Sequence, residues 1–309
     1  MSVPDLSVPK SALSGIVTIG NFDGVHRGHQ AMLATVRAQA DAFGCATVAV
    51  TFDPHPASVL RPDVLLPRLT TISRRTQLLR SFGADHVVVL PVTRSLLQMS
   101  PELFFAEIVV GQLHSRGVVE GPDFRFGKDR AGDTTTLQQL CATAGVAVNV
   151  IAPAVSDGAM ISSTQIRHLL TAGRIEQANC LFGHRYAVAG TVTHGAGRGR
   201  LLSFPTANLE QIDVLIPSDG VYAGACRIRQ ACYPVAVHIG HNPTFEDGAR
   251  KVECHLIGFT GDLYDQRLEV EFLKELRPLQ KFSGPEQLSH QIHADIAACV
   301  AAFEAEVID

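Results

Sequence analysis

The sequence of 309 residues lacks tryptophan, any Cys-x-x-Cys pair and any excess of positive charge. Its seven cysteines are scattered and odd in number, which argues against a disulfide framework or a zinc ribbon and favours a reducing compartment. The formal net charge of −4 leaves no electrostatic footprint for nucleic acid. No apolar run approaches the roughly 20 residues that span a bilayer, and residues 1–13 lack the apolar core of a signal peptide. We therefore expect a cytoplasmic protein that binds neither nucleic acid nor membrane.

The first half of the chain alternates strand-like and helix-like patterns. Apolar runs at 16–20 and 46–52 flank a segment of helical period at 27–43, which together predict one β–α–β unit with a parallel crossover. Further along, a helix is predicted over 101–113, with proline at its start, and another over 134–144. This alternation predicts a doubly wound, Rossmann-like α/β domain over residues 1–183.

The pattern changes after Gly183. Alternating β-branched stretches, separated by turn residues, occupy 186–193, 221–228, 233–239, 252–257 and 268–272, and no helical period returns until about 284–305. We predict an antiparallel β-barrel or sandwich, closed by one C-terminal helix, over residues 184–309. A length of 309 residues is enough for each of the two domains to bury its own core.

The stretch from Val17 to His29 predicts a strand, a turn and the first turn of a helix. A helix N-terminus at the end of a strand favours anions because its free N–H groups and its dipole are positive. His26 and His29 would share one face of that turn, which suggests phosphate chemistry. A metal pair is disfavoured, since no third or fourth ligand has suitable spacing; two structural histidines remain the alternative.

A second candidate phosphate site opens the predicted helix after Ile161. Ser162 or Ser163 suits an N-cap, and Arg167 would point from the first turn, so that hydroxyls, free amides and a guanidinium converge.

Two glycine-rich segments are candidate ligand loops. The segment 121–132 fails as a P-loop, because its spacing is one residue too long and no Ser or Thr follows Lys128. It is either a ligand-contacting loop or a mobile surface loop. The segment 195–200 combines glycines that allow close approach to phosphates with two arginines, and a flexible hairpin is the alternative.

The second half also holds candidate metal and base residues. Thr206 and Asn208 alternate to one face if their segment is extended, and a hydroxyl and an amide oxygen suit Mg²⁺ together with substrate phosphates; a plain turn is the alternative. Glu253 and His255 share one face of a predicted strand, where the carboxylate could accept a proton from an attacking hydroxyl. A solvent-facing strand glutamate is the alternative.

Several motifs follow one another in an order that carries a family resemblance. They are Gly20-x-Phe22-Asp23-Gly24-Val25-His26-x-Gly28-His29, Thr51-Phe52-x-Pro54-His55-Pro56, Gly121-x-Asp123-Phe124-Arg125-Phe126-Gly127, Ile161-Ser162-Ser163-Thr164-x-Ile166-Arg167, Phe204-Pro205-Thr206-Ala207-Asn208-Leu209, Gly220-Val221-Tyr222, Ile239-Gly240-x-Asn242-Pro243-Thr244-Phe245, Glu253-x-His255-Leu256 and Gly261-Asp262-Leu263-Tyr264. Over nearly the whole chain, the sequence resembles the bacterial bifunctional riboflavin kinases/FMN adenylyltransferases, the prokaryotic FAD synthetases.

The resemblance implies a riboflavin kinase β-barrel with a C-terminal helix and an N-terminal nucleotidyltransferase domain. The barrel would transfer the γ-phosphate of ATP to the ribityl 5′-hydroxyl of riboflavin, giving FMN and ADP. The N-terminal domain would let the FMN phosphate attack the α-phosphate of a second ATP, giving FAD and pyrophosphate. Both reactions would need Mg²⁺, and both depend on positioning and electrostatics without a covalent enzyme intermediate.

The resemblance also implies residue roles. In the N-terminal domain, His26 and His29 would be catalytic; Gly20, Asn21, Gly28, Ser162, Ser163, Thr164 and Arg167 would bind ATP and pyrophosphate; and Phe52, Pro54, Asp123 and Phe124 would bind the flavin. In the barrel, Thr206 and Asn208 would position Mg²⁺, Gly197, Arg198, Gly199 and Arg200 would wrap the nucleotide phosphates, and Glu253 would be the general base.

Four residues of the kinase half depart from the family pattern: Ser203, Gly258, Asp265 and Leu279. Three alternatives follow from what the motifs leave open. The chain could be a monofunctional FMN adenylyltransferase whose barrel only binds flavin, a flavin-binding protein without ATP turnover, or a nucleotidyltransferase for another substrate such as pantetheine phosphate. Appearance of FMN from riboflavin and ATP would separate the bifunctional enzyme from the monofunctional one.

Overall fold

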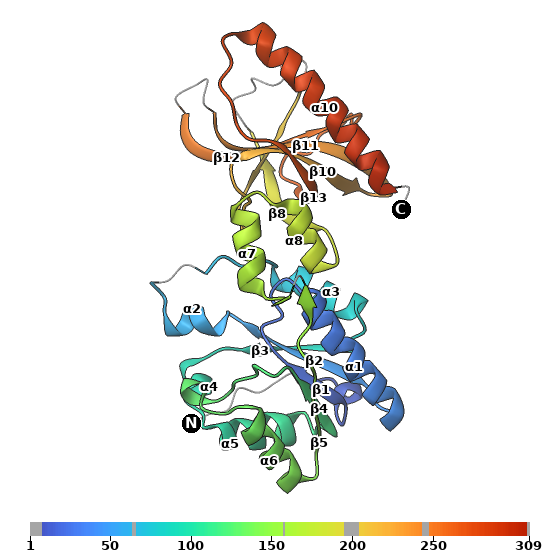
Figure 1. The fold of residues 1–309 in the computed structure, drawn as a ribbon, viewed down its shortest axis with the longest axis vertical. Coiled ribbons are helices and arrows are strands. Elements are labelled where there is room, and N and C mark those ends of the chain that lie inside the picture. Colours follow the sequence, from blue (N-terminus) through green and yellow to red (C-terminus); the bar gives the residue numbers. More distant parts are fainter. Residues whose placement is uncertain (1–7, 64–65, 157, 195–203, 243–246, 308–309) are drawn as a thin grey trace. The chain divides into compact units, whose positions relative to one another are not determined.

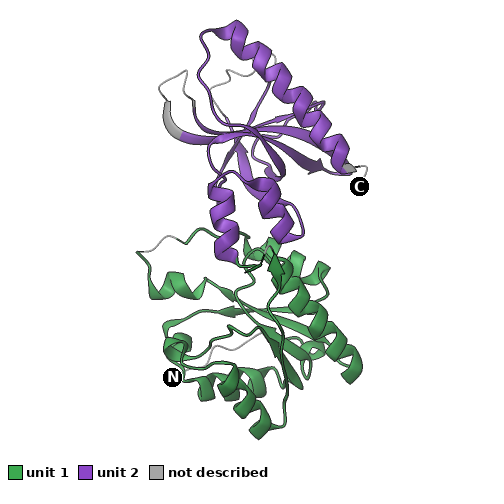
Figure 2. Cartoon of the chain, in the orientation of Figure 1, with its two compact units in different colours: residues 1–162 green, residues 163–309 purple. Residues whose placement is uncertain are grey.

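The computed structural model describes residues 8–63, 66–156, 158–194, 204–242 and 247–307 (Figure 1). The chain divides into two compact units, residues 1–162 and 163–309 (Figure 2). The first is an α/β unit and the second contains a closed barrel, so that both predicted fold classes are confirmed.

The first unit is built on a five-stranded parallel sheet in the order β3-β2-β1-β4-β5. Its strands are β1 (Ile16–Ile19), β2 (Thr47–Asp53), β3 (His86–Pro91), β4 (Gly117–Glu120) and β5 (Ala147–Val150). The chain runs outward from β1 to β3 and then returns to the other side of β1 with β4. The strand order therefore reverses between β1 and β4, and the crevice outside the carboxyl ends of the strands at such a point is where open α/β sheets bind ligands.

Helices cover both faces of this sheet (Figure 1). They are α1 (Arg27–Phe43), α2 (Pro56–Leu60), α3 (Ile72–Ser81), α4 (Arg94–Leu97), α5 (Pro101–Phe104), which continues as a π-helix over Phe105–Gln112, and α6 (Thr134–Ala144), with 3₁₀ turns at Lys10–Ala12 and Lys128–Arg130. A short hairpin, β6 (Val155–Ser156) and β7 (Ala159–Met160), follows β5.

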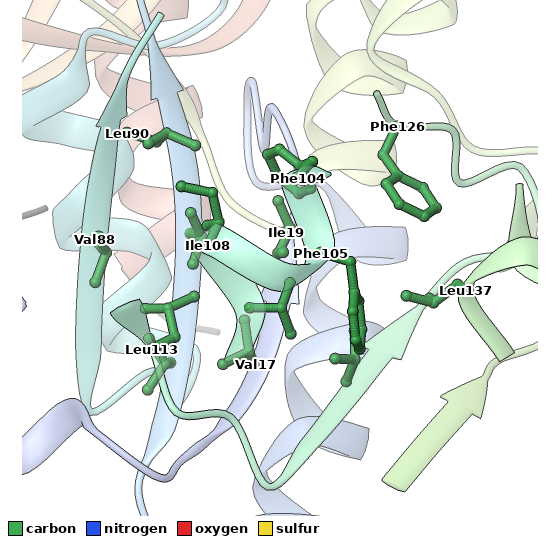
Figure 3. Packing of buried hydrophobic residues seen from close by; sticks show 14 of the residues in the cluster. Val17, Ile19, Val88, Leu90, Phe104, Phe105, Ile108, Leu113, Phe126 and Leu137 are labelled. Carbon is green, nitrogen blue, oxygen red and sulfur yellow. The ribbon is translucent and has the colours of Figure 1, made fainter. Parts of the chain in front are cut away.

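An apolar cluster of the first unit lies on the sheet face covered by α5 and its π-helical continuation (Figure 3). Phe104, Phe105 and Ile108 pack there against Val17 of β1 and Leu90 of β3, all less than a tenth exposed. Side chains on the other face pack against α1 and α3, because successive strand residues point to opposite faces.

The second unit begins with α7 (Ser163–Thr171) and α8 (Ile175–Phe182) and continues as a barrel. The barrel strands are β8 (Tyr186–Thr193), β9 (Ala207–Glu210), β10 (Gly220–Ile228), β11 (Ala231–Asn242), β12 (Asp247–Leu256) and β13 (Arg267–Arg277). Their order is β10-β11-β12-β9-β8-β13, and β13 pairs back to β10, so the sheet is closed and a sandwich is excluded. The C-terminal helix α10 (Pro285–Val307) packs Cys299 and Ala302 on Ala223 and Leu273, outside the barrel.

The compact units divide at Ser162, whereas the sequence predicts a boundary at residue 183. Side-chain and backbone hydrogen bonds tie α7 and α8 to the second unit. Asn179 donates to the carbonyl of Phe272 at 2.9 Å and accepts from the backbone N–H of Tyr186 at 2.8 Å, and the N–H of Ser218 donates to the carbonyl of Leu170 at 3.1 Å. The two helices therefore follow the barrel rather than the α/β sheet in this division.

Candidate active sites

A strained turn joins β1 to α1 and carries the two predicted histidines. In this histidine loop (residues 20–29), Phe22, Gly24 and Val25 have φ angles of 47°, 88° and 41°, in the left-handed region that non-glycine residues rarely adopt. Phe22 and Val25 are almost fully buried. His26 is the N-cap residue of α1, so the predicted helix start is confirmed and both histidines lie at the anion-favouring end of the helix.

The two imidazole rings are stacked. Their centroids lie 3.6 Å apart with an interplanar angle of 17°, and the ring of Phe22 meets His29 edge-on at 5.1 Å. Burial lowers the pKa of His29 well below its usual value, and the neighbouring His26 and Arg75 lower it further. The Nδ1 atom of His29 is buried and has no hydrogen-bond partner among the described residues. His29 is thus a neutral side chain with an unused polar atom.

Glycines leave room for this arrangement. A Cβ atom at Gly28 would lie 3.1 Å from the His26 ring, and one at Gly20 would lie 3.2 Å from the Phe22 ring. Both separations are tighter than ordinary van der Waals contact, so a side chain at either position would displace an aromatic ring of the histidine loop.

A buried ion pair anchors the histidine loop to the start of α3. Asp23 and Arg75 are each 2% exposed, and their side chains meet at 3.3 Å. Asp23 also accepts hydrogen bonds from the backbone N–H groups of Leu69 and Thr70 at 3.0 Å and from the Thr70 hydroxyl at 3.1 Å. Sequence analysis gave Arg75 no role, because it lies on a separate helix with nothing in the local pattern to mark it.

A pocket of about 460 Å³ opens at the carboxyl ends of β1 and β2. Five predicted residues line it: Gly20, Asn21, Phe52, Asp123 and Phe124. The Oδ1 atom of Asn21 is buried without a hydrogen-bond partner among the described residues. Pro54 is not one of the lining residues. Other lining residues carry charge or aromatic surface but were given no individual role from the sequence: His55 and Arg61, and Arg125, Phe126 and Arg130 of the candidate ligand loop 121–132.

Aromatic rings form one wall of this pocket. Phe124 and Phe126 are stacked with centroids 5.3 Å apart, and Phe104 tilts against Phe126 at 6.0 Å. Arg125 is paired with Asp133 at 3.1 Å. The pocket therefore combines a flat apolar wall with side chains of both charges, among them Arg61, Arg130 and Asp129, which suits an aromatic ligand that carries polar and phosphate groups.

A buried carboxyl lies where β1 and β4 separate. The two strands pair only at Ile16 and Val17, and beyond this point the side chain of Glu120 accepts a hydrogen bond from the Ile19 N–H at 2.6 Å. Glu120 is 2% exposed, and burial raises its pKa well above the usual range, opposed only in part by that hydrogen bond.

We expect Glu120→Gln to stabilise the protein at neutral and alkaline pH. The unfolded chain ionises this carboxyl near pH 4.3, whereas the folded chain keeps it protonated to higher pH, so wild-type stability falls as pH rises between the two pKa values. The glutamine retains an oxygen for Ile19 and cannot ionise. Thermal unfolding should show a higher Tm for the variant at about pH 8 and a difference that shrinks toward about pH 4. A pH-independent difference would contradict this account.

Along the chain, the Ser162–Arg167 motif spans the residue at which the two compact units divide. Ser162 ends the first unit, and Ser163, Thr164 and Arg167 lie in the opening turns of α7. The predicted helix start is confirmed, while the convergence of this motif with the histidine loop stays a prediction.

In the barrel, four polar residues form one row across neighbouring strands. His238 pairs in register with Glu253, Glu253 with Asn208, and Asn208 with Thr193. Residues directly opposite in an antiparallel pair share a face, and their strand neighbours Val252, Leu209 and Val192 are buried on the other face. Asn208 and Glu253, predicted separately, thus lie side by side on the outside of the barrel. His238, which sequence analysis missed, extends the row.

A second pocket, of about 330 Å³, includes Thr206 but neither Asn208 nor Glu253 among its lining residues. The segment before β9 is held from both sides. His255 contacts the carbonyl oxygen of Pro205 through Nδ1 at 2.8 Å, and the ring of Phe204 meets His255 and His293 of α10 edge-on, at 5.9 and 5.0 Å. The predicted phosphate loop of Gly197, Arg198, Gly199 and Arg200, as well as Ser203, lies outside the described residues.

One departure from the family pattern has a physical explanation. Asp265, where glycine is common in the family, has a φ angle of 60°. Aspartate is one of the few non-glycine residues that adopt this left-handed conformation readily. The backbone geometry of the turn is therefore retained without glycine.

Two features are absent from the described residues, a cluster of metal-ligating side chains and a membrane-spanning helix. No three His, Cys, Asp or Glu side chains come together in that part of the chain to form a metal-binding group. None of the described helices combines the length and apolar character needed to cross a membrane.

Comparisons with known proteins assign both halves of the chain to families. The FAD synthetase family model matches residues 8–165, and the riboflavin kinase family model matches residues 182–303. The bifunctional riboflavin kinase/FMN adenylyltransferase of Pseudomonas fluorescens is 38% identical over 287 residues, covering 93% of this chain and 92% of the relative. The enzyme of the same description from Escherichia coli (strain K12) is 32% identical, covering 91% and 90%.

A solved structure has a similar fold. It is described as a macrolide-efflux protein from Streptococcus pneumoniae, is 28% identical to this chain and has a TM-score of 0.85, covering 96% of this chain and 95% of the other. The likeness extends over both compact units.

Proposed function

The chain belongs to the family of bifunctional riboflavin kinases/FMN adenylyltransferases, and on that premise we propose how its residues divide between the two reactions of FAD synthesis. Its barrel phosphorylates riboflavin to FMN with ATP, and its α/β domain adenylylates FMN to FAD with release of pyrophosphate. The match of the riboflavin kinase family to residues 182–303 favours this reading over a barrel that only binds flavin.

In the adenylyltransferase domain, His26 and His29 bind the phosphates of ATP and stabilise the charge that develops on the α-phosphoryl oxygens. The neutral ring of His29, its unused Nδ1 atom and the adjacent N-terminus of α1 support this role. A phosphate oxygen of FMN attacks the α-phosphorus, the bond to the β-phosphate bridging oxygen breaks, and pyrophosphate leaves. Ser162, Ser163, Thr164 and Arg167 hold that pyrophosphate.

The pocket beside the histidine loop binds FMN. Phe52 and Phe124 provide apolar surface for the isoalloxazine ring, and Asn21 and Asp123 provide polar contacts. Pro54 was assigned to the flavin by resemblance alone. Its neighbour His55, which does line the pocket, is the better candidate.

We expect Phe124→Ala to weaken FMN binding in the adenylyltransferase domain, because it removes one ring of the stacked pair that lines the pocket. The KM for FMN in FAD formation should rise by roughly tenfold, which corresponds to the loss of about 1–2 kcal/mol of ring contact. Steady-state kinetics with FMN measure this, and the KM for riboflavin in FMN formation serves as the control. An unchanged KM for FMN would place the flavin elsewhere.

In the kinase domain, Glu253 accepts the proton of the ribityl 5′-hydroxyl as its oxygen attacks the γ-phosphorus of ATP, and ADP leaves. The register of β12 and β9 supports this role, since it places Glu253 directly beside Asn208. The loop containing Gly197 and Arg200 wraps the nucleotide phosphates.

Thr206 and Asn208 are suited to a divalent cation. A hydroxyl and an amide oxygen are hard ligands of the kind that Mg²⁺ accepts when substrate phosphates and waters complete its shell. When bound, Mg²⁺ supplies positive charge that offsets the negative charge of the transferring phosphoryl group. The cysteines are scattered and free, which further favours a cytoplasmic location. The proposed substrates, riboflavin, FMN and ATP, are all small molecules.

One time course tests the functional assignment. Riboflavin and ATP with Mg²⁺ are supplied to the full chain, and riboflavin, FMN and FAD are separated and quantified together. We expect FMN to appear first and FAD to follow at its expense. If supplied FMN is adenylylated while riboflavin stays unchanged, the kinase assignment fails.

A further inference from the structure

Two strained residues of the histidine loop need external restraint. The left-handed backbone at Phe22 and Val25 costs roughly 1–3 kcal/mol at each residue and persists only where surrounding contacts enforce it. Apolar packing contributes, since both side chains lie in a buried cluster with Leu33, Leu78 and Leu79. Packing alone leaves the polar backbone of the loop to be held by other groups.

The polar restraint comes from Asp23, Thr70 and Arg75. The Thr70 hydroxyl donates to Asp23 at 3.1 Å and accepts from the Gly24 N–H at 3.1 Å, so it bridges two successive residues of the loop. Arg75 closes the network with its contact to Asp23 at 3.3 Å. We call Asp23, Thr70 and Arg75 the loop clamp.

Arg75 also reaches the end of β2. Its Nη1 atom donates to the Thr51 hydroxyl at 3.2 Å and to the Phe52 carbonyl at 3.3 Å. Thr51 in turn donates to the carbonyl of Asn21 at 3.0 Å. One buried guanidinium thus connects the loop that carries the histidines with Asn21 and Phe52, which line the pocket.

The charge of Arg75 acts on His29 as well. Arg75 disfavours the protonated imidazole, in the same direction as burial and His26. Asp23, Arg68 and Asp53 are the charged groups around Arg75 itself. Only Asp23 is buried with it, since the side chains of Arg68 and Asp53 are 39% and 41% exposed.

We propose that Arg75 is a positioning residue for adenylyl transfer: through the loop clamp it holds the histidine loop in the geometry that presents His26 and His29 to the phosphates of ATP. The proposal rests on the assignment of His26 and His29 to ATP. It predicts two separable effects, one on the geometry of the loop and one on the charge state of His29.

Three variants of the full chain separate these effects: Arg75→Gln, Arg75→Lys and Thr70→Val. The measurements are the pKa of His29 in the substrate-free protein, followed by NMR of ¹³Cε1-labelled histidine and assigned with His29→Ala, and the kcat and KM of FAD formation from FMN. Circular dichroism and thermal unfolding report in each variant whether the α/β unit is folded, and FMN formation by the barrel is the control for the second unit.

Arg75→Gln should raise the pKa of His29, because a nearby positive charge is lost. It should also lower the kcat of FAD formation by about a hundredfold, as expected for misplaced catalytic groups. Arg75→Lys should keep the low pKa and most of the activity. Thr70→Val should lower kcat while leaving the pKa of His29 unchanged, since it alters the clamp without altering charge.

The outcomes are decisive in either direction. An Arg75→Gln protein that forms FMN normally but keeps the wild-type pKa of His29 and kcat overturns the proposal. If thermal unfolding shows that Arg75→Gln is not folded, Thr70→Val decides, and an unchanged kcat of FAD formation in that variant overturns the proposal. Normal FAD formation by His29→Ala would instead refute the assignment of the two histidines to ATP. That conclusion does not depend on the pKa of His29 measured in Arg75→Gln.

Discussion

His29→Ala is expected to abolish FAD formation while sparing FMN formation. The substitution removes the side chain with the unused Nδ1 atom and the partner on which His26 stacks at 3.6 Å. Loss of one group that stabilises developing charge costs about 10²–10³ in kcat. Loss of the stack adds to this, because the ring of His26 loses the ring that packs against it at 3.6 Å. Product analysis with FMN and ATP measures the first activity, and with riboflavin and ATP the second.

A matched control is available on the same sheet. His86 begins β3, at the edge opposite the carboxyl ends that carry the histidine loop, so His86→Ala removes an imidazole without touching the site. It should leave both activities near wild type. Loss of both activities in a folded His29→Ala protein would contradict the assignment of two separate ATP sites.

Several elements could be predicted from the sequence because their period is strong and local. The helices at 27–43 and 134–144 and the strand at 186–193 begin and end where the sequence indicates. In each case apolar residues recur at one spacing throughout, and glycine ends both helices in a left-handed conformation. Most of the first candidate site follows from these elements, since the histidines lie at the first turn of one of them.

Other features depend on contacts that no local pattern encodes. The helix expected over 101–113 is present, but it widens into a π-helix at Phe105, which has the same apolar pattern as an α-helix at this length. Alternation in the second half fits a barrel and a sandwich equally well, and only the pairing of β10 with β13 decides between them. In the sequence, Arg75 is one of several arginines in a predicted helix, and only the tertiary structure shows that it is buried against Asp23.

In the kinase site, too, the sequence predicts individual residues but not their contacts. Asn208 and Glu253 could each be proposed from motif and strand alternation, but their adjacency depends on the register of β9 against β12. His238 is recognised as part of the site only from the register of β11, which pairs it with Glu253. Burial lowers the pKa of His238, so this histidine adds a neutral group beside Glu253 rather than a second charge.

Glu253→Ala is therefore expected to abolish FMN formation from riboflavin while FAD formation from supplied FMN continues. The carboxylate is the proposed acceptor of the 5′-hydroxyl proton, and a positioned general base contributes about 10²–10⁴ in rate. Glu253→Gln should lose nearly as much, because the amide keeps the size of the side chain but cannot take the proton. A loss in Glu253→Ala that Glu253→Gln restores would assign the residue to binding rather than to proton transfer.

The control for this prediction lies on another strand of the same barrel. Glu269 is an exposed residue of β13, which is not a neighbour of β12 in the strand order, and Glu269→Ala removes a strand carboxylate away from the Glu253–Asn208 pair. Its FMN formation should stay near wild type.

With riboflavin as the starting substrate, Glu253→Ala should yield neither FMN nor FAD, whereas His29→Ala should accumulate FMN. Mixing the two variants should restore FAD synthesis, since FMN released by one is adenylylated by the other. Failure of the mixture to make FAD, with Glu253→Ala still active on supplied FMN, would show that the FMN formed by His29→Ala is not released into solution.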